Sequence, residues 1–115
     1  MKTLFIVNDP PYGTERAYNA LRLALAMGKA GAEITVFLLA DAVAGARQGQ
    51  QTPDGHYNIE RMLKRVLAGH GTVLLCGTCM DARGLREDEV VEGARRSTMD
   101  ELAAATAAAD KVLAF

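Results

Sequence analysis

Two cysteines, Cys76 and Cys79, are the residues whose type and spacing most clearly permit chemistry. They lie three positions apart, at the end of an apolar run and before a short polar segment. A Cys-x-x-Cys pair occurs in redox disulfides, forms half of many zinc sites, and can supply a reactive thiolate. Free cysteines are also often small buried hydrophobic residues, and that alternative stays open for both.

The rest of the sequence fits a redox or metal site poorly. A thioredoxin-like site needs a cis-proline loop downstream of its cysteines, whereas Pro10, Pro11 and Pro53 all precede them. Structural zinc takes four ligands, and one Cys-x-x-Cys with His56 and His70 falls short unless two subunits share the metal. The GxGxxG dinucleotide motif is absent from NDPPYGTE and from CGTCMDARG. We therefore expect no metal and no cofactor.

A thiolate nucleophile agrees better with the residues around the cysteines. Thr78 predicts the cap of a short helix, Cys79–Arg83, whose amides would stabilise negative charge on a sulfur at Cys79 or just before it. Arg83 lies one turn after Cys79 and adds positive charge. Gly77 lets the backbone come close to whatever the sulfur carries.

Composition limits the class of protein. A chain of 115 residues forms one domain, and 50% hydrophobic with 23% charged residues is ordinary for a globular protein. A net charge of -1, 5% aromatic residues and no Trp argue against nucleic-acid binding. The apolar run Leu4–Val7 is too short for a signal peptide or a membrane span. We expect a cytoplasmic protein, where two cysteines are more often reactive than structural.

Strand and helix patterns alternate along the chain. Asp88–Gly93 is ambiguous between a helical turn and a short fourth strand. The alternation predicts an α/β fold with a parallel sheet covered on both faces. The expected elements are strand Thr3–Val7, a helix capped by Thr14 and running to about Ala30, strand Glu33–Leu39, a helix from Ile59 to Gly69, strand Thr72–Cys76, a helix from Thr98 to about Ala109, and strand Lys111–Phe115.

Three unusual segments follow the first three strands. They are NDPPYGT, the long loop Asp41–Asn58, and CGTCMDARG. Ligands of parallel sheets gather at the carboxyl ends of the strands, so we expect these segments to meet there. The Gly and Gln content of the long loop suits a lid over the thiol, with a surface loop or a subunit contact as the alternative.

Longer motifs carry a resemblance to a known family. They are NDPPYGTERAYNALRLA, PDGHYNIERML, LLCGTCMDARGL, and STMDELAAAT with ADKVLAF. Over nearly its whole length the chain resembles the DsrE/DsrF-like family of small sulfur-relay proteins, particularly its YchN-type branch. The resemblance implies a single three-layer α/β/α domain over residues 1–115, with a five-stranded, mainly parallel sheet. It also implies assembly as a homo-oligomer, a trimer or a hexamer.

In sulfur-relay members of that family, a cysteine just after the third strand carries sulfur as a persulfide. Arg-Gly follows it seven and eight positions later, and Cys76, Arg83 and Gly84 match this pattern. Helix electrostatics slightly favour Cys79, but the family spacing and the strand-end position favour Cys76 as the carrier. The resemblance thus implies a sulfurtransferase-like carrier that exchanges sulfur with donor and acceptor proteins, with Cys79 able to resolve the persulfide as a disulfide.

The expected site has a catalytic part and a pocket. Two alternatives remain: an oligomeric module that binds a small ligand without catalysis, and a Cys-x-x-Cys thiol-redox protein. We expect neither nucleic acid nor membrane as a partner. The catalytic residues are Cys76, Cys79 and Arg83, and the pocket residues are Asn8, Tyr12, Gly77, Thr78 and Gly84.

Overall fold

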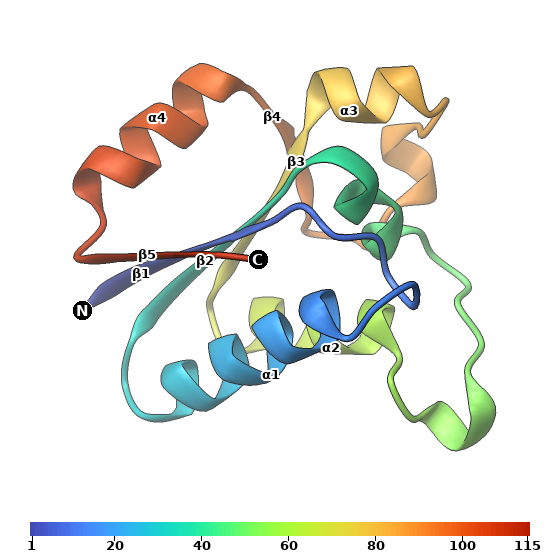
Figure 1. Cartoon of the computed structure of the whole chain (residues 1–115), viewed down its shortest axis with the longest axis horizontal. Helices are drawn as coiled ribbons and strands as arrows, with labels where there is room; N and C mark the ends of the chain where they lie inside the picture. Colours follow the sequence, from blue (N-terminus) through green and yellow to red (C-terminus); the bar gives the residue numbers. More distant parts are fainter.

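A five-stranded, fully parallel β-sheet forms the centre of the molecule in the computed structural model, which describes residues 1–115 (Figure 1). The strand order is β4-β3-β2-β1-β5, and every neighbouring pair is parallel. The predicted five-stranded α/β fold is confirmed. The strands are β1 (Lys2–Val7), β2 (Glu33–Leu38), β3 (Thr72–Cys76), β4 (Arg95–Ser97) and β5 (Lys111–Ala114).

Helices cover both faces of the sheet. In Figure 1, α1 (Arg16–Lys29) and α2 (Ile59–Ala68) lie on one face and α4 (Met99–Ala108) on the other. The short α3 (Gly77–Ala82) begins directly at the carboxyl end of β3. Because helices cover both faces, the central strands are continuous apolar runs whose largest side chains are fully buried.

The predicted helix α2 is confirmed in detail. Asn58 caps it, with its side-chain oxygen accepting a hydrogen bond from the Arg61 amide at 2.9 Å. Glu60 and Lys64, one turn apart on this helix, form an ion pair at 3.3 Å. Its apolar positions Ile59, Met62, Leu63 and Val66 are buried.

Helix α1 begins later than Thr14 predicts. Glu15 occupies the cap position and makes no side-chain cap hydrogen bond. The Thr14 hydroxyl instead accepts a bond from the Arg16 amide at 3.2 Å and donates to Asp9. The end is as expected, because the chain leaves the helix through Gly31, whose φ is +103°.

The fourth strand lies beyond Asp88–Gly93. That segment overlaps the end of a 3₁₀ turn, Glu87–Glu89, which is followed by one isolated bridge between Val90 and Arg47. The strand itself is Arg95–Ser97, three residues long at the edge of the sheet. Its two arginines tolerate exposure there, because short, charged edge strands avoid unwanted pairing.

Most of the long connection after β2 is fastened to the body of the protein. Its first part is a 3₁₀ helix, Ala40–Ala46, with four buried residues. The Gln48 amide then donates to the Glu89 carbonyl at 2.8 Å, and the Gln50 amide donates to Glu60 at 2.8 Å. Gln48 and Gln50 thus bond to the turn around Glu89 and to α2, and in neither bond to a cysteine.

Helix α4 is attached to the sheet by few residues. Thr98 caps it as predicted, accepting from the Glu101 amide at 3.1 Å. Leu102 is its only buried residue, although the helix is rich in alanine. None of the helices combines the length and apolar character that crossing a bilayer requires.

Candidate thiol site

Cys76 lies at the junction of β3 and α3. Only 7% of the residue is exposed. Its sulfur accepts a hydrogen bond from the Cys79 amide at 3.3 Å, and the Thr78 hydroxyl lies 3.3 Å away. The cap of α3 is therefore the sulfur of Cys76, and the prediction of a Thr78 cap with the helix starting at Cys79 is wrong. Strand β3 runs directly into α3. The side chain of the last strand residue therefore reaches an amide of the first helical turn that has no partner within the helix.

The Cys76 environment favours the thiolate. Burial raises the pKa of Cys76, but hydrogen bonds from the Cys79 thiol, the Thr78 hydroxyl and the amides of both residues outweigh burial. The net effect holds the pKa of Cys76 below its ordinary value. A lowered pKa increases the thiolate fraction near neutral pH, and the thiolate is the nucleophilic form.

Cys79 has the opposite environment. Burial and the neighbouring thiol of Cys76 raise its pKa, and these outweigh the Ala40 amide, which donates to the Cys79 sulfur at 3.2 Å. Ala40 has a left-handed φ of +50°, which is uncommon for a residue with a side chain. Such strain often accompanies functional positions. The pair thus combines a lowered pKa at Cys76 with a raised pKa at Cys79.

Arg83 approaches Cys79 rather than Cys76. Its Nε donates to the Asp41 carboxylate at 2.8 Å, and its Nη1 donates to the Cys79 carbonyl at 3.1 Å. Its charge is a minor influence that lowers the Cys79 pKa. Arg83 therefore ties α3 to the start of the 3₁₀ helix after β2.

The arginine near Cys76 is Arg96, which sequence reasoning missed. It follows Arg95 on β4, in register with the residue before Cys76 on β3. Its guanidinium covers Gly77 so closely that a side-chain carbon there would lie 2.8 Å from the Arg96 Cζ. Two hydrogen bonds of 2.8 Å hold it to the Asp81 carboxylate.

Arg96 and Cys76 interact electrostatically. The Asp81 carboxylate is the main reason that the pKa of Arg96 lies above its ordinary value, and the charge of Cys76 is a smaller one. The sequence signal was the Arg-Arg pair shortly before Thr98, the cap of α4. It acquires meaning only once the order of β3 and β4 in the sheet is known.

The expected pocket residues do not all gather at the thiols. Gly77 and Thr78 do, and Gly84 ends α3 with a left-handed φ of +63°. Asn8 instead donates through its side-chain amide to the Phe115 carbonyl at 3.4 Å. The Tyr12 hydroxyl bonds to Gln50 and accepts from the Ile59 amide at 3.0 Å, so it anchors the start of α2.

The best-defined hollows of the surface lie away from the cysteines. Four of the seven hollows have volumes of about 440, 410, 240 and 150 Å³, and neither cysteine lines any of these four. No group of three or more His, Cys, Asp or Glu side chains is arranged to hold a metal ion. The thiol site thus lies at the carboxyl edge of the sheet, where β3 meets α3.

Known proteins are similar to this chain in sequence. The model of the DsrE/DsrF-like family matches residues 1–115. The chain is 40% identical over 116 residues to the Escherichia coli protein YchN, covering 99% of this chain and 98% of that protein. It is also 40% identical over 115 residues to an uncharacterized protein of Methanocaldococcus jannaschii, with 100% of both chains covered.

Solved structures of other proteins have a similar fold. The crystal structure of Escherichia coli YchN matches with a TM-score of 0.94 at 38% identity, covering 100% of this chain and 99% of that chain. A protein of unknown function from Methanobacterium thermoautotrophicum matches with a TM-score of 0.81 at 11% identity, covering 99% of this chain and 98% of that chain. At that identity the second match shows the fold alone.

Proposed function

Because the chain belongs to the DsrE/DsrF-like family, we propose that it is a sulfurtransferase-like sulfur carrier with Cys76 as the accepting residue. The observation that carries the proposal is the set of hydrogen bonds on the Cys76 sulfur. The Cys79 amide and the Thr78 hydroxyl both lie 3.3 Å from it, and the pKa of the thiol is lowered despite burial.

The reaction is thiol exchange. In loading, the Cys76 thiolate attacks the terminal sulfur of a donor persulfide, R–S–SH. The donor S–S bond breaks, the donor leaves as the thiolate R–S⁻, and Cys76 becomes a persulfide. In unloading, an acceptor thiolate attacks the same terminal sulfur and Cys76 leaves as a thiolate. Neither step involves net oxidation, so no cofactor is required.

The surroundings of Cys76 suit both steps. The hydrogen bonds that stabilise its thiolate make it a nucleophile in loading and a leaving group in unloading. Arg96, held over Gly77 by Asp81, places positive charge beside the sulfur that gains charge. Because Cys76 is largely buried, its surroundings would shield a loaded persulfide from other thiols in solution.

Intact-mass analysis after exposure to glutathione persulfide tests the proposal. We expect wild type and Cys79→Ser to gain the mass of one sulfur atom, and Cys76→Ser to gain none. Loading of Cys76→Ser but not of Cys79→Ser would assign the cargo to Cys79. Loading of neither wild type nor variants, in protein shown to be folded and reduced, would remove the sulfur-carrier function.

A thiol-redox pair is the second candidate, favoured by one observation. The Cys79 amide lies 3.3 Å from the Cys76 sulfur, and the pKa of each cysteine depends on the thiol of the other. Equilibration in glutathione buffers followed by alkylation measures the potential of a Cys76–Cys79 disulfide. A potential near that of thioredoxin, about -270 mV, in a protein that takes up no sulfur would favour the redox function.

The proposed carrier requires partner proteins and a reducing compartment. We propose a cytoplasmic protein that receives sulfur from a donor protein and delivers it to an acceptor protein, because thiolates persist in a reducing compartment. We also propose a homo-oligomer, a trimer or a hexamer. The sparse attachment of α4, with Leu102 as its only buried residue, supports a subunit contact on that side.

A further inference from the structure

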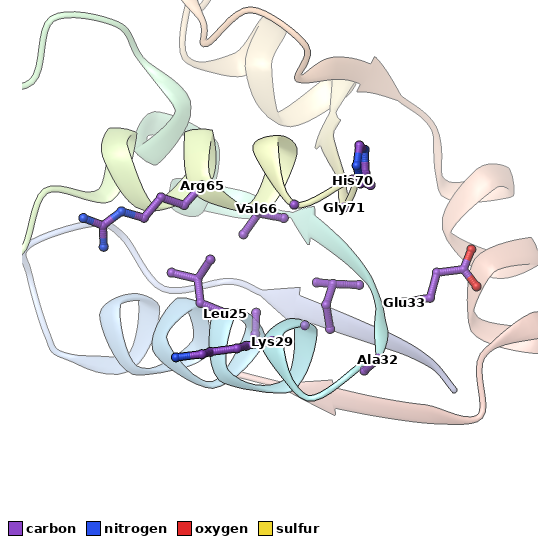
Figure 2. Close-up of a pocket in the computed structure, with 12 residues that line it drawn as sticks. Leu25, Lys29, Ala32, Glu33, Arg65, Val66, His70 and Gly71 are labelled. Carbon is purple, nitrogen blue, oxygen red and sulfur yellow. The ribbon is translucent and has the colours of Figure 1, made fainter.

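A two-part groove runs between α1 and α2, in the helix layer opposite α4. Figure 1 shows this helix layer, and Figure 2 shows the residues that line the larger of the two hollows. It consists of one hollow of about 440 Å³ and one of about 410 Å³. Leu25 and Arg65 line both, so the hollows adjoin one another. Each volume lies within the range of about 300–1,000 Å³ typical of small-molecule sites. No residue of the thiol site lines either hollow.

Unpaired positive charge is concentrated in this groove. The chain has 13 Lys and Arg residues, and seven of them form ion pairs. Of the six that form none, four line the groove, whereas the only carboxylate among its lining residues is Glu33. A protein with a net charge of -1 thus presents a locally basic surface. The four are Arg22, Lys29, Arg61 and Arg65.

The larger hollow has an apolar floor. Figure 2 shows Leu25 of α1 and Val66 of α2 pointing toward one another between the helices. Gly28 faces the same space, and a side-chain carbon there would meet Ile34 at 3.4 Å. Gly28 has no side chain to fill the gap between the two packed helices. An apolar hollow therefore remains open beside the basic side chains.

The smaller hollow is aromatic and cationic. The rings of Tyr18 and Tyr57 pack with centroids 4.2 Å apart, and the Arg22 guanidinium lies 5.5 Å over the Tyr18 ring. Arg61 lies against the backbone of Gly55, where a side-chain carbon would come within 2.4 Å of its Nη1. Tyr57 is held at a left-handed φ of +61°, a strain of the kind found at ligand sites.

We propose that this groove binds a small organic anion that carries a phosphate-class group. The guanidinium groups of Arg22, Arg61 and Arg65 hold the phosphate, because arginine donors match the geometry of phosphate oxygens. The apolar body of the ligand occupies the hollow between Leu25 and Val66. The site is separate from the thiols and does not depend on sulfur transfer.

Tyrosine fluorescence supplies a direct readout. The chain has no Trp and three Tyr, and two of these, Tyr18 and Tyr57, line the groove. Titration with hexyl phosphate should change the tyrosine emission in a saturable way at low salt. Inorganic phosphate, which lacks the apolar body, should bind at least about ten times more weakly.

Charge variants locate the site. Arg61→Gln and Arg65→Gln should each weaken hexyl phosphate binding about tenfold, the effect of losing a charge-assisted hydrogen bond. Arg86→Gln is the matched control, because Arg86 is exposed, pairs with Asp88 and lies outside the groove. It should leave affinity unchanged. Circular dichroism checks that each variant is folded.

Three results would overturn the proposal. The first is no saturable change with hexyl phosphate up to millimolar concentration. The second is equal loss in Arg86→Gln and Arg61→Gln, which would indicate general attraction of anions. The third is a response of Tyr18 and Tyr57 to an acidic peptide but not to hexyl phosphate, which would assign the groove to a protein partner. None of them bears on persulfide loading of Cys76, so this test and that of the sulfur carrier fail independently.

Discussion

Cys76 and Cys79 share one turn of backbone, but their pKa values are shifted in opposite directions. The Cys79 amide donates to the Cys76 sulfur, and hydrogen bonding from Cys79 helps to lower the pKa of Cys76 despite burial. Cys79 receives a single amide, from Ala40, and its pKa is raised because burial dominates. Two identical side chains three positions apart are therefore expected to differ in reactivity.

This difference predicts a pH profile for alkylation. The pKa of Cys76 is lowered, so its thiolate forms at lower pH than in a free cysteine, and its alkylation should begin at lower pH. The pKa of Cys79 is raised, so its alkylation should require higher pH than a free cysteine does. Site-resolved mass spectrometry after brief iodoacetamide pulses measures both midpoints. Equal midpoints, or the reverse order, would contradict the assignment of Cys76 as the thiolate.

Strand β4 brings Arg96 to the sulfur, which leads to a second prediction. Arg96→Gln removes the charge over Gly77, so the Cys76 alkylation midpoint should move to higher pH. Arg95→Gln is the matched control, because the neighbouring Arg95 pairs with Glu101 instead. The Arg95 variant should leave the midpoint in place. An equal shift in both would show that Arg96 acts through general charge and not through its position.

The 3₁₀ helix after β2 offers a test of strain. Ala40 has a φ of +50°, which glycine adopts freely, so Ala40→Gly should keep or raise the free energy of unfolding, by up to about 1 kcal/mol. Ala42→Gly, in the same segment but buried and without a positive φ, should lower it. Urea denaturation measures both. Destabilisation by Ala40→Gly equal to that of Ala42→Gly would mean that the Ala40 backbone is unstrained.

Strands and helices with an apolar or helical sequence pattern were predictable. Elements that depend on contacts with other parts of the fold, such as β4 and the cap of α3, were not. Strand β3 is observed as Thr72–Cys76, as predicted, because a strand buried on both faces is a continuous apolar run. Strand β4 was missed because Arg95 and Arg96 resemble a loop. The sulfur cap of α3 was missed because cap preferences describe Ser, Thr, Asp and Asn, not a cysteine ending a strand.

At the scale of the whole molecule, α4 and β5 present an apolar surface that packs against little of the chain. Met99 is 62% exposed and Val112 41% exposed. Ala103, Ala104, Ala107 and Ala108 are exposed as well. A surface of this composition is typical of a contact between subunits.

The fourth prediction is that this surface holds the oligomer together. Light scattering should give a mass that is a multiple of 12.3 kDa for wild type, and Ala104→Glu should shift it toward the monomer. Leu23→Glu is the control, since Leu23 is 40% exposed on α1, in the opposite helix layer. A monomeric wild type would contradict the oligomer. Dissociation by Leu23→Glu alone would move the contact to the α1 side.

The parallel sheet also governs how quickly the chain reaches its native state. Every pairing needs a crossover, and the β1–β5 pairing joins Thr3 to Lys111, nearly the full length of the sequence. Such pairings form slowly, because loop-closure entropy is lost before the contacts are gained.

We expect β5 to dock late in folding, so Val112→Ala should accelerate unfolding while leaving the refolding rate nearly unchanged. Stopped-flow kinetics in urea measures both rates, and slower refolding would place β5 in the folding nucleus. Until β5 docks, one side of β1 remains an open strand edge, which makes the interval before docking the time at which this chain is most prone to aggregate.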